Sequence, residues 1–420
     1  MTAAGRIAAS YFSGRRLCLP GIAVILYSVS LLKYVSRDAL AGTASGPQGV
    51  LELALPSAAL ALLIIYCRFH GTILVVPRSA VFFGLFGWAA TIAASNSPWP
   101  VFSLAKSFIF FCVLGIAVLV CSAMGTNETA RWLYRTLVLI LGLAVLATAA
   151  LGKDALLYID EHTGRRYITI LATHPSTVAD LVAVAFLLGK ITRPRPHWAT
   201  QTVLLVLNLA LGSKTSTAIL LFIVILSIAV RLPRAVRAVL ILTAGASAVA
   251  AIMVASTSGY SLGDAALDAL QPIYGNRMSE EAATLDGRTE LWQVSAELVL
   301  RHPLLGFGFD GARRELLASV PWAGHSHNGI VEMLLAGGVL GTMLGLAGWG
   351  ASATACLRMP ANMRWPLISV HLYLFVVALD NPIPMTTQFL GVFLIVWSHA
   401  CAIEGSSLRA PGLKLSMARS

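Results

Sequence analysis

The sequence predicts an all-α, polytopic membrane protein with about 12 transmembrane helices. Two observations carry this prediction. Of the 420 residues, 57% are hydrophobic and only 12% are charged, whereas a soluble protein of this size carries about 25% charged residues. Apolar runs of roughly 15 to 22 residues also recur along the chain, and such runs can cross a hydrocarbon core of about 30 Å. A water-soluble globular fold is therefore excluded.

The apolar runs place the spans in order along a single transmembrane domain, residues 1–420. The first run follows Arg15 and Arg16, and no convincing small-residue cleavage site follows it. We therefore expect a retained span rather than a removed signal peptide. The expected spans lie at 17–33, 50–67, 79–95, 105–123, 133–152, 170–189, 200–213, 216–230, 238–256, 328–349, 366–380 and 387–403.

Basic residues predict the orientation of these spans, because the cytoplasmic loops of membrane proteins are enriched in Lys and Arg. With a cytoplasmic N-terminus, most of the 30 Lys and Arg residues fall on the inner side, and every inner loop between spans is short. We therefore expect both termini on the inner side. The formal charge of +11 reflects this topology and does not indicate nucleic-acid binding.

Two outer segments are unusual. The spans at 200–213 and 216–230 form a tight hairpin with the tip GSKTST, residues 212–217. We expect this tip to dip below the headgroups, where non-helical backbone must line a cavity or be buried in protein. The outer loop at 257–326, between the ninth and tenth spans, is much longer than the rest. Its patterning predicts short helices, the first capped by Asp286, that form a small lid.

Neither a disulfide framework nor a metal site is indicated. The six cysteines lie within or beside apolar runs, without a CxxC or a metal-ligand spacing. The outer carboxylates are scattered and form no DxD pair, whereas a Mg²⁺-dependent sugar-nucleotide mechanism would need them clustered. We expect neither a metal nor a cofactor.

Histidines and cationic side chains gather at the outer ends of the spans. Arg and Lys bind phosphate oxygens, and a histidine can take up a proton near neutral pH. Together they suit transfer of a group away from a phosphate-bearing leaving group at the membrane surface. The candidate site residues are His325, His327, Arg288, Lys214, Arg165, Arg166, His174 and Asn328.

Three motifs resemble one bacterial family. His327-Asn328, nine residues, then Gly338-Val-Leu-Gly341-Thr342 match the pattern H-[NSQ]-x9-G-x-x-G-[TNY] of O-antigen ligases. The stretch GRTELWQVSAELVLRHPLLGFGFDG, residues 287–311, resembles the preceding segment in the same superfamily, which includes the O-antigen and exopolysaccharide polymerases. The tip LGSKTST is similar to the SxSR segment of many ligases, but Lys214 replaces their Arg, as in succinoglycan-type polymerases.

The resemblance implies a GT-C-like, metal-independent, inverting glycosyltransferase in the bacterial inner membrane, with its active site facing the periplasm and both termini in the cytoplasm. The implied donor is an undecaprenyl-diphosphate-linked oligo- or polysaccharide, and the acceptor is a glycan or the lipid A core. Membrane lipids and chain-length or export proteins are further implied partners. His327 would be the base, Arg288 and Lys214 would hold the diphosphate, and Arg166 or Arg165 would add a phosphate contact. The additional candidates are His325, Asn328 and His174.

Several of these residues have a structural alternative. His327 and Asn328 could cap a span, Lys214 could snorkel to the headgroups, and Arg165 and Arg166 could bind lipid phosphate. His174 could be purely structural, and the adjacent pair Arg313 and Arg314 is expected on a solvated lid face. The same reasoning expects Gly338 and Gly341 to allow close helix packing and Glu332 to face the protein interior.

The functional alternatives also stay open. SKTS and GFGFDG favour a polysaccharide polymerase over an O-antigen ligase. A transporter with the same spans would instead place ionisable groups near the membrane midplane in a cluster open to both sides. A non-catalytic partner of a polysaccharide exporter would tolerate loss of His327.

Overall fold

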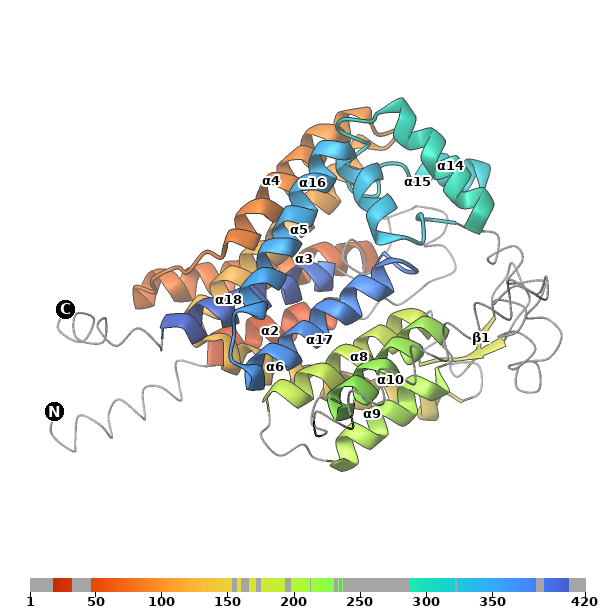
Figure 1. Ribbon diagram of the computed structural model, residues 1–420. Helices are drawn as coiled ribbons and strands as arrows, with labels where there is room; N and C mark the ends of the chain where they lie inside the picture. The colour runs from red at the N-terminus through yellow and green to blue at the C-terminus, as the bar shows by residue number, and fades with distance from the viewer. Residues whose placement is uncertain are drawn as a thin grey trace, which may run out of the picture. The chain divides into compact units, whose positions relative to one another are not determined.

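The computed structural model describes residues 18–31, 47–152, 157–159, 166–170, 175–192, 198–211, 213–229, 233, 236, 288–321, 323–382 and 389–407 (Figure 1). The chain divides into two compact units. The larger unit comprises Met1–Leu220 and Leu298–Ser420, and the smaller one comprises Leu221–Glu297. All side-chain contacts discussed below lie within the larger unit.

The regular secondary structure of the described residues is helical apart from one short hairpin. The helices are α2 (Cys18–Ser30), α3 (Pro47–His70), α4 (Arg78–Ala93), η2 (Ala94–Asn96), α5 (Pro100–Met124), α6 (Thr126–Leu151), α8 (Pro175–Thr192), α9 (Trp198–Ala210), α10 (Lys214–Ala229), α14 (Arg288–Arg301), α15 (Arg313–Ser319), α16 (Gly329–Leu357), α17 (Ala361–Ala378) and α18 (Leu390–Ser407). The predicted all-helical class is confirmed, and one short antiparallel hairpin, β1 (Leu157–Ile159) with β2 (Arg166–Ile168), accompanies the helices. Their short LYI and RYI runs combine aromatic and β-branched residues, which favour strands.

The helices confirm a polytopic membrane class. Five segments are long and apolar enough to cross a bilayer: Gly49–His70, Arg78–Asn96, Pro100–Met124, Thr126–Leu151 and Gly329–Leu357. Shorter apolar helices occur at Leu19–Ser30, Trp198–Ala210, Thr215–Ala229 and Leu390–Ser406. These elements overlap the spans expected from the sequence, whereas the expected span at 238–256 lies outside the described residues.

Two helices form the inside of the larger unit. Residues 178–188 of α8 and 390–402 of α18 are buried on every side, as expected for helices that are apolar all round. α18 packs against α4, α5, α6, α16 and α17. It is also fixed to the start of α6, because the Glu404 carboxylate accepts hydrogen bonds from Thr126 N (3.1 Å) and Oγ1 (2.6 Å).

Glycines bring α16 close to α4, and the two helices run side by side (Figure 1). A Cβ atom on Gly341 would lie 3.2 Å from the ring of Phe86, and one on Gly348 would lie 3.2 Å from Phe83. Small residues at such positions let the backbones approach in a membrane protein. The close-packing role expected for Gly341 is therefore confirmed.

A buried polar cluster joins α16, α17 and α18. Trp349 Nε1 donates to His371 Nδ1 (3.1 Å), and Ser352 Oγ lies 3.2 Å from His371 Nε2 while it donates to Ile395 O (2.7 Å). Because the Ser352 proton goes to Ile395, these contacts assign the imidazole proton of His371 to Nε2. His371 is only 5% exposed.

Candidate functional site

The chain makes a sharp turn just before α16. His327 has φ +51°, a left-handed backbone conformation that is uncommon for a residue with a side chain. Asn328 is the N-cap of the helix: its Oδ1 accepts hydrogen bonds from Ile330 N (2.9 Å) and Val331 N (3.1 Å). Its Nδ2 donates to Leu379 O (3.1 Å) at the end of α17. The capping interpretation therefore holds for Asn328, and the cap places His327 at the mouth of α16.

Glu332 stabilises this turn from inside the protein. Its Oε2 accepts hydrogen bonds from Ser326 N (3.0 Å) and Ser326 Oγ (2.8 Å), one residue before His327. The arrangement extends the logic of a capping box, in which a carboxylate in the first turn reaches back to a backbone N–H before the helix. Glu332 is 6% exposed, so the expectation that it faces the interior is confirmed.

The two imidazoles of the motif lie together. The ring centroids of His325 and His327 are 4.1 Å apart, and His327 N lies 3.3 Å from His325 Nδ1, to which it donates. Since Nδ1 accepts, this contact assigns the proton of a neutral His325 to Nε2. His325 therefore supports the backbone turn at His327, and both rings belong to one site.

Arg313 reaches the same turn, which the sequence did not predict. Its guanidinium lies against Gly324, where an added Cβ would be 3.1 Å from Arg313 Cζ. Arg313 is only partly exposed and lies within electrostatic range of Glu332 and Lys106. The expected solvated face holds only for Arg314, which is exposed and lies over the Trp99 ring. A short helix such as α15 turns successive residues in different directions, so one arginine points inward.

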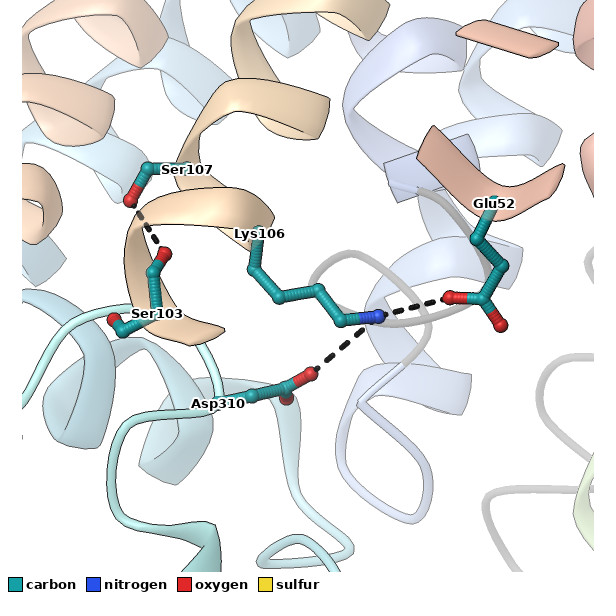
Figure 2. Close-up of polar contacts among 5 residues, drawn as sticks. All are labelled: Glu52, Ser103, Lys106, Ser107 and Asp310. Atoms are coloured by element: carbon teal, nitrogen blue, oxygen red, sulfur yellow. Dashed lines mark hydrogen bonds and ion pairs between the residues drawn. The ribbon is translucent and has the colours of Figure 1, made fainter. Parts of the chain in front are cut away.

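A second charged group lies near the N-terminal end of α5 (Figure 2). Lys106 Nζ is 3.1 Å from Glu52 Oε2 on α3 and 3.9 Å from Asp310 Oδ2 on the loop before α15. All three side chains are more than three-quarters buried. Lys106 thus connects α3, α5 and the Asp310 loop. The sequence did not predict this cluster, because nothing local to Lys106 indicates partners so distant in the chain.

The glycine-rich loop docks onto a break in α16. Gly338 has φ +60° and ψ −164°, which interrupts the helix and frees backbone groups on both sides. Phe307 N and Gly308 N donate to the carbonyl oxygens of Leu335 (2.7 Å) and Ala336 (2.9 Å). In return, Val339 N donates to Pro303 O (2.8 Å). The glycines of GFGFDG and of GVLGT therefore belong to one interlocked structure.

Gly338 consequently does more than the expected close packing. A Cβ atom there would overlap the backbone of Leu304 and Leu305, so only glycine fits both the conformation and the contact. Asn96 Nδ2 donates to Gly306 O (2.9 Å) and Ser97 Oγ donates to Gly311 O (3.0 Å), which holds the loop from the side of η2. The loop is fixed between α4–η2 and α16, directly before the residues that carry Arg313.

A buried hydrogen-bond network lies at the start of α10. Tyr373 Oη donates to Asp180 Oδ1 (2.7 Å), and Asn381 Nδ2 donates to Asp180 Oδ2 (3.1 Å). Ser216 Oγ lies 2.8 Å from Tyr373 Oη, and Asn208 Nδ2 donates to Ser216 Oγ (3.3 Å). The network connects α8, α9, α10 and α17. It also holds Asn381, in the Asp380-Asn381-Pro382 segment, just after the C-terminal end of α17.

For the remaining expected site residues, the structure describes either the backbone alone or nothing. Lys214 is the first residue of α10, Arg288 is the first residue of α14, and Arg166 is the first residue of β2, paired with Ile159. Their side chains lie outside the described part of the structure. Arg165 and His174 lie outside the described residues altogether. Contacts from these cations to His327 therefore stay predictions.

Apolar helices around a cluster of charged and imidazole side chains define a multi-pass membrane protein with a polar site at one end of its spans. Residues 200–346 match a family described as O-antigen ligase. The match covers only this part of the chain and supports its resemblance to the superfamily of O-antigen ligases and polymerases. The matched region includes Lys214, Arg288, His327 and Gly338, and it ends before α17. A comparison with curated proteins found no match.

Proposed function

We propose that this protein is a metal-independent, inverting glycosyltransferase that moves a saccharide from undecaprenyl diphosphate to a glycan acceptor on the periplasmic face, as a polysaccharide polymerase. The family gives the coarser class of a glycosyltransferase-like enzyme with glycan and lipid-linked substrates. The observation that carries the finer proposal is the turn at His327. Its left-handed backbone is held by Asn328, Glu332 and the ring of His325 at the mouth of an apolar helix.

In the proposed reaction an imidazole nitrogen of His327 removes the proton from the acceptor hydroxyl. The acceptor oxygen then forms a bond to the anomeric carbon as the bond from that carbon to the phosphate oxygen breaks. Undecaprenyl diphosphate leaves with the electron pair, the anomeric configuration inverts, and the imidazolium returns its proton to water. One positioned general base contributes about 10²–10⁴-fold to such a reaction.

Cations in this proposal stabilise the leaving group. A diphosphate already leaves well, so neutralising its charge and positioning the reactants supply much of the rate. Lys214 and Arg288 hold the diphosphate, and Arg166 or Arg165 adds a contact. The N-terminal amides of α16 next to His327 also favour an anion, because the free N–H groups of a helix end point toward it. Asn328 Oδ1 accepts from two of these amides, Ile330 N and Val331 N.

Ligation is the second candidate, and the description of the family as O-antigen ligase favours it. A ligase would transfer the finished glycan to the lipid A core by the same chemistry. The transporter alternative is less well supported. A transporter should carry its ionisable groups in a midplane cluster open to both sides of the membrane. In this protein His371, an ionisable residue of α17, is instead buried and hydrogen-bonded to Trp349 and Ser352.

The test is complementation by His327→Ala in a host deleted for the gene, with protein level checked and surface glycans separated on a gel. We expect loss of product at normal protein level. The matched control is His302→Ala, which removes another half-buried histidine of the same loop region, packed on Phe307, and should retain activity. Full activity of His327→Ala would show that the mechanism is wrong.

The same gels separate the two reactions. In the inactive host, short unpolymerised glycans on an otherwise normal lipid core indicate that the protein is a polymerase. A naked core together with long lipid-linked chains indicates a ligase. Normal glycans in the deleted host would count against both.

A further inference from the structure

The donor and acceptor roles in the hydrogen-bond network around Asp180 can be assigned. A carboxylate only accepts hydrogen bonds, so the Tyr373 hydroxyl donates its single proton to Asp180 Oδ1 (2.7 Å). Tyr373 Oη can therefore only accept from Ser216 Oγ, which lies 2.8 Å away. Ser216 Oγ in turn accepts from Asn208 Nδ2 (3.3 Å). Asn208 Nδ2 also donates to Ala179 O (2.8 Å), and the hydroxyl donors of Ser216 and Tyr373 point in sequence toward Asp180.

The network holds the turn that precedes α10. Thr217 Oγ1 donates to Asn208 Oδ1 (2.9 Å), and Thr217 N donates to Ser213 O (3.0 Å), so the end of α9 and the start of α10 support each other. Ser216, which is 1% exposed, joins this turn to α17 through Tyr373. Lys214 lies two residues before Ser216 and is the first residue of α10.

The same end of α17 holds the turn at His327. Asn328 Nδ2 donates to Leu379 O (3.1 Å), and a Cβ on Gly329 would lie 3.1 Å from the Cβ of Ala378. Two residues after Leu379, Asn381 Nδ2 donates to Asp180 Oδ2 (3.1 Å). One short segment, Ala378 to Asn381, therefore binds both the cap of α16 and the network at the start of α10.

We propose that Asp180 and Tyr373 are positioning residues that set the backbone of Lys214 relative to that of His327. The inference rests on the proposed function, in which Lys214 holds the donor diphosphate and His327 acts as the base. Neither Asp180 nor Tyr373 touches substrate in this proposal. They act through Ser216 on one side and through Asn381 and the end of α17 on the other. The two motifs, which are far apart in the sequence, are coupled because both are anchored to this segment.

The first experiment measures binding of undecaprenyl diphosphate to the full-length protein in lipid nanodiscs. Tyr373→Phe keeps the ring and removes the hydroxyl, and we expect it to weaken binding about tenfold. Lys214→Ala should weaken binding at least as much. The double variant should bind no more weakly than Lys214→Ala alone, because Tyr373 acts through Lys214. Additive losses would contradict the proposal.

The matched control is Ser352→Ala, which removes another buried, hydrogen-bonded hydroxyl next to His371 in the same unit. It should lower thermal stability about as much as Tyr373→Phe and leave diphosphate binding unchanged. If Ser352→Ala weakens binding equally, the effect of Tyr373→Phe is general destabilisation and the proposal is wrong.

Hydrogen–deuterium exchange separates failure of this inference from failure of the proposed function. Tyr373→Phe should speed exchange in residues 208–217, and Ser352→Ala should not. Unchanged exchange in Tyr373→Phe would overturn the positioning role. If exchange rises as expected but Lys214→Ala binds the diphosphate normally, the assignment of Lys214 is wrong, while Asp180 and Tyr373 still hold this turn.

Discussion

At the scale of single residues, the site depends on side chains that hold a backbone turn more than on the reacting group itself. His327 adopts a left-handed conformation that costs free energy for any residue with a side chain. Asn328 offsets this cost by capping α16, and Glu332 does so by binding Ser326. The apolar surroundings make these bonds strong and their loss costly. A change one residue away can therefore disable His327 without touching it.

Glu332 provides the sharpest test of this idea. Glu332→Gln keeps an oxygen that can accept from Ser326 N and Oγ, so the turn and most of the activity should remain. Glu332→Ala removes the acceptor of the buried Ser326 N–H, at a cost of about 1–3 kcal/mol, while Ser326 Oγ can still donate to Asn328 O (2.9 Å), and the substitution should abolish activity. The measurement is glycan production together with the melting temperature of each purified variant.

The two variants distinguish geometry from charge. Suppose that Glu332→Gln folds normally but is as inactive as Glu332→Ala. The charge of Glu332, and not only its hydrogen bonds, would then be needed for proton transfer.

At the scale of elements, the sequence allowed correct predictions wherever local chemistry decides the outcome. The buried position of Glu332, the close packing at Gly341 and the overlap of apolar runs with helices follow from residue type and spacing. The break at Gly338 could not be predicted, because adjacent glycines are compatible with a continuous helix. Only the docked Pro303–Leu304 backbone shows why the helix is interrupted there.

The charged partners were missed for a related reason. Lys106 meets Asp310 only because the glycine-rich loop is fixed on α16 and by Asn96, and Arg313 faces inward because α15 starts from that same loop. These positions depend on contacts between distant segments, which no local pattern encodes. The roles of Lys214, Arg288, Arg166, Arg165 and His174 remain predictions of the sequence.

The interlocked glycines can be tested with two variants of one helix. Gly338→Ala would place a side chain in a backbone conformation that only glycine adopts readily, and its Cβ would overlap the backbone of Leu304. We therefore expect the free energy of unfolding to fall by about 3 kcal/mol or more. Gly341→Ala, in regular helix, would place a Cβ 3.2 Å from the edge of Phe86 and 3.7 Å from the Cβ of Ala89, and should lower the free energy of unfolding by about 1 kcal/mol. Melting temperatures of the two proteins in the same detergent give the comparison.

If the two variants had the same melting temperature, the break in α16 would be unimportant to stability. A larger shift for Gly341→Ala would mean that the packing of α4 on α16, and not the docked loop, limits the stability of this helix.

At the scale of the whole molecule, the proposed chemistry requires that the two ends of α16 lie on opposite sides of the membrane. The helix is long enough to cross, and its N-terminal end carries His327 while its C-terminal end is followed by Arg358. Basic residues around the C-terminal end, including Arg364, predict that this end is cytoplasmic. The site at His327 then faces the periplasm, where a lipid-linked donor would present its saccharide.

Cysteines introduced one at a time on α15, which precedes α16 in the chain, and directly after the C-terminal end of α16 test this topology. Arg314 and Arg358 are both exposed, whereas the five described native cysteines are buried thiols that should react slowly. We expect Arg314→Cys to react with a membrane-impermeant maleimide in intact spheroplasts, and Arg358→Cys to react only after the membrane is permeabilised. The unsubstituted protein measures background labelling. The reverse pattern would place His327 in the cytoplasm, where the lipid-linked donor is not displayed, and the proposed function would fail even if His327 proved essential.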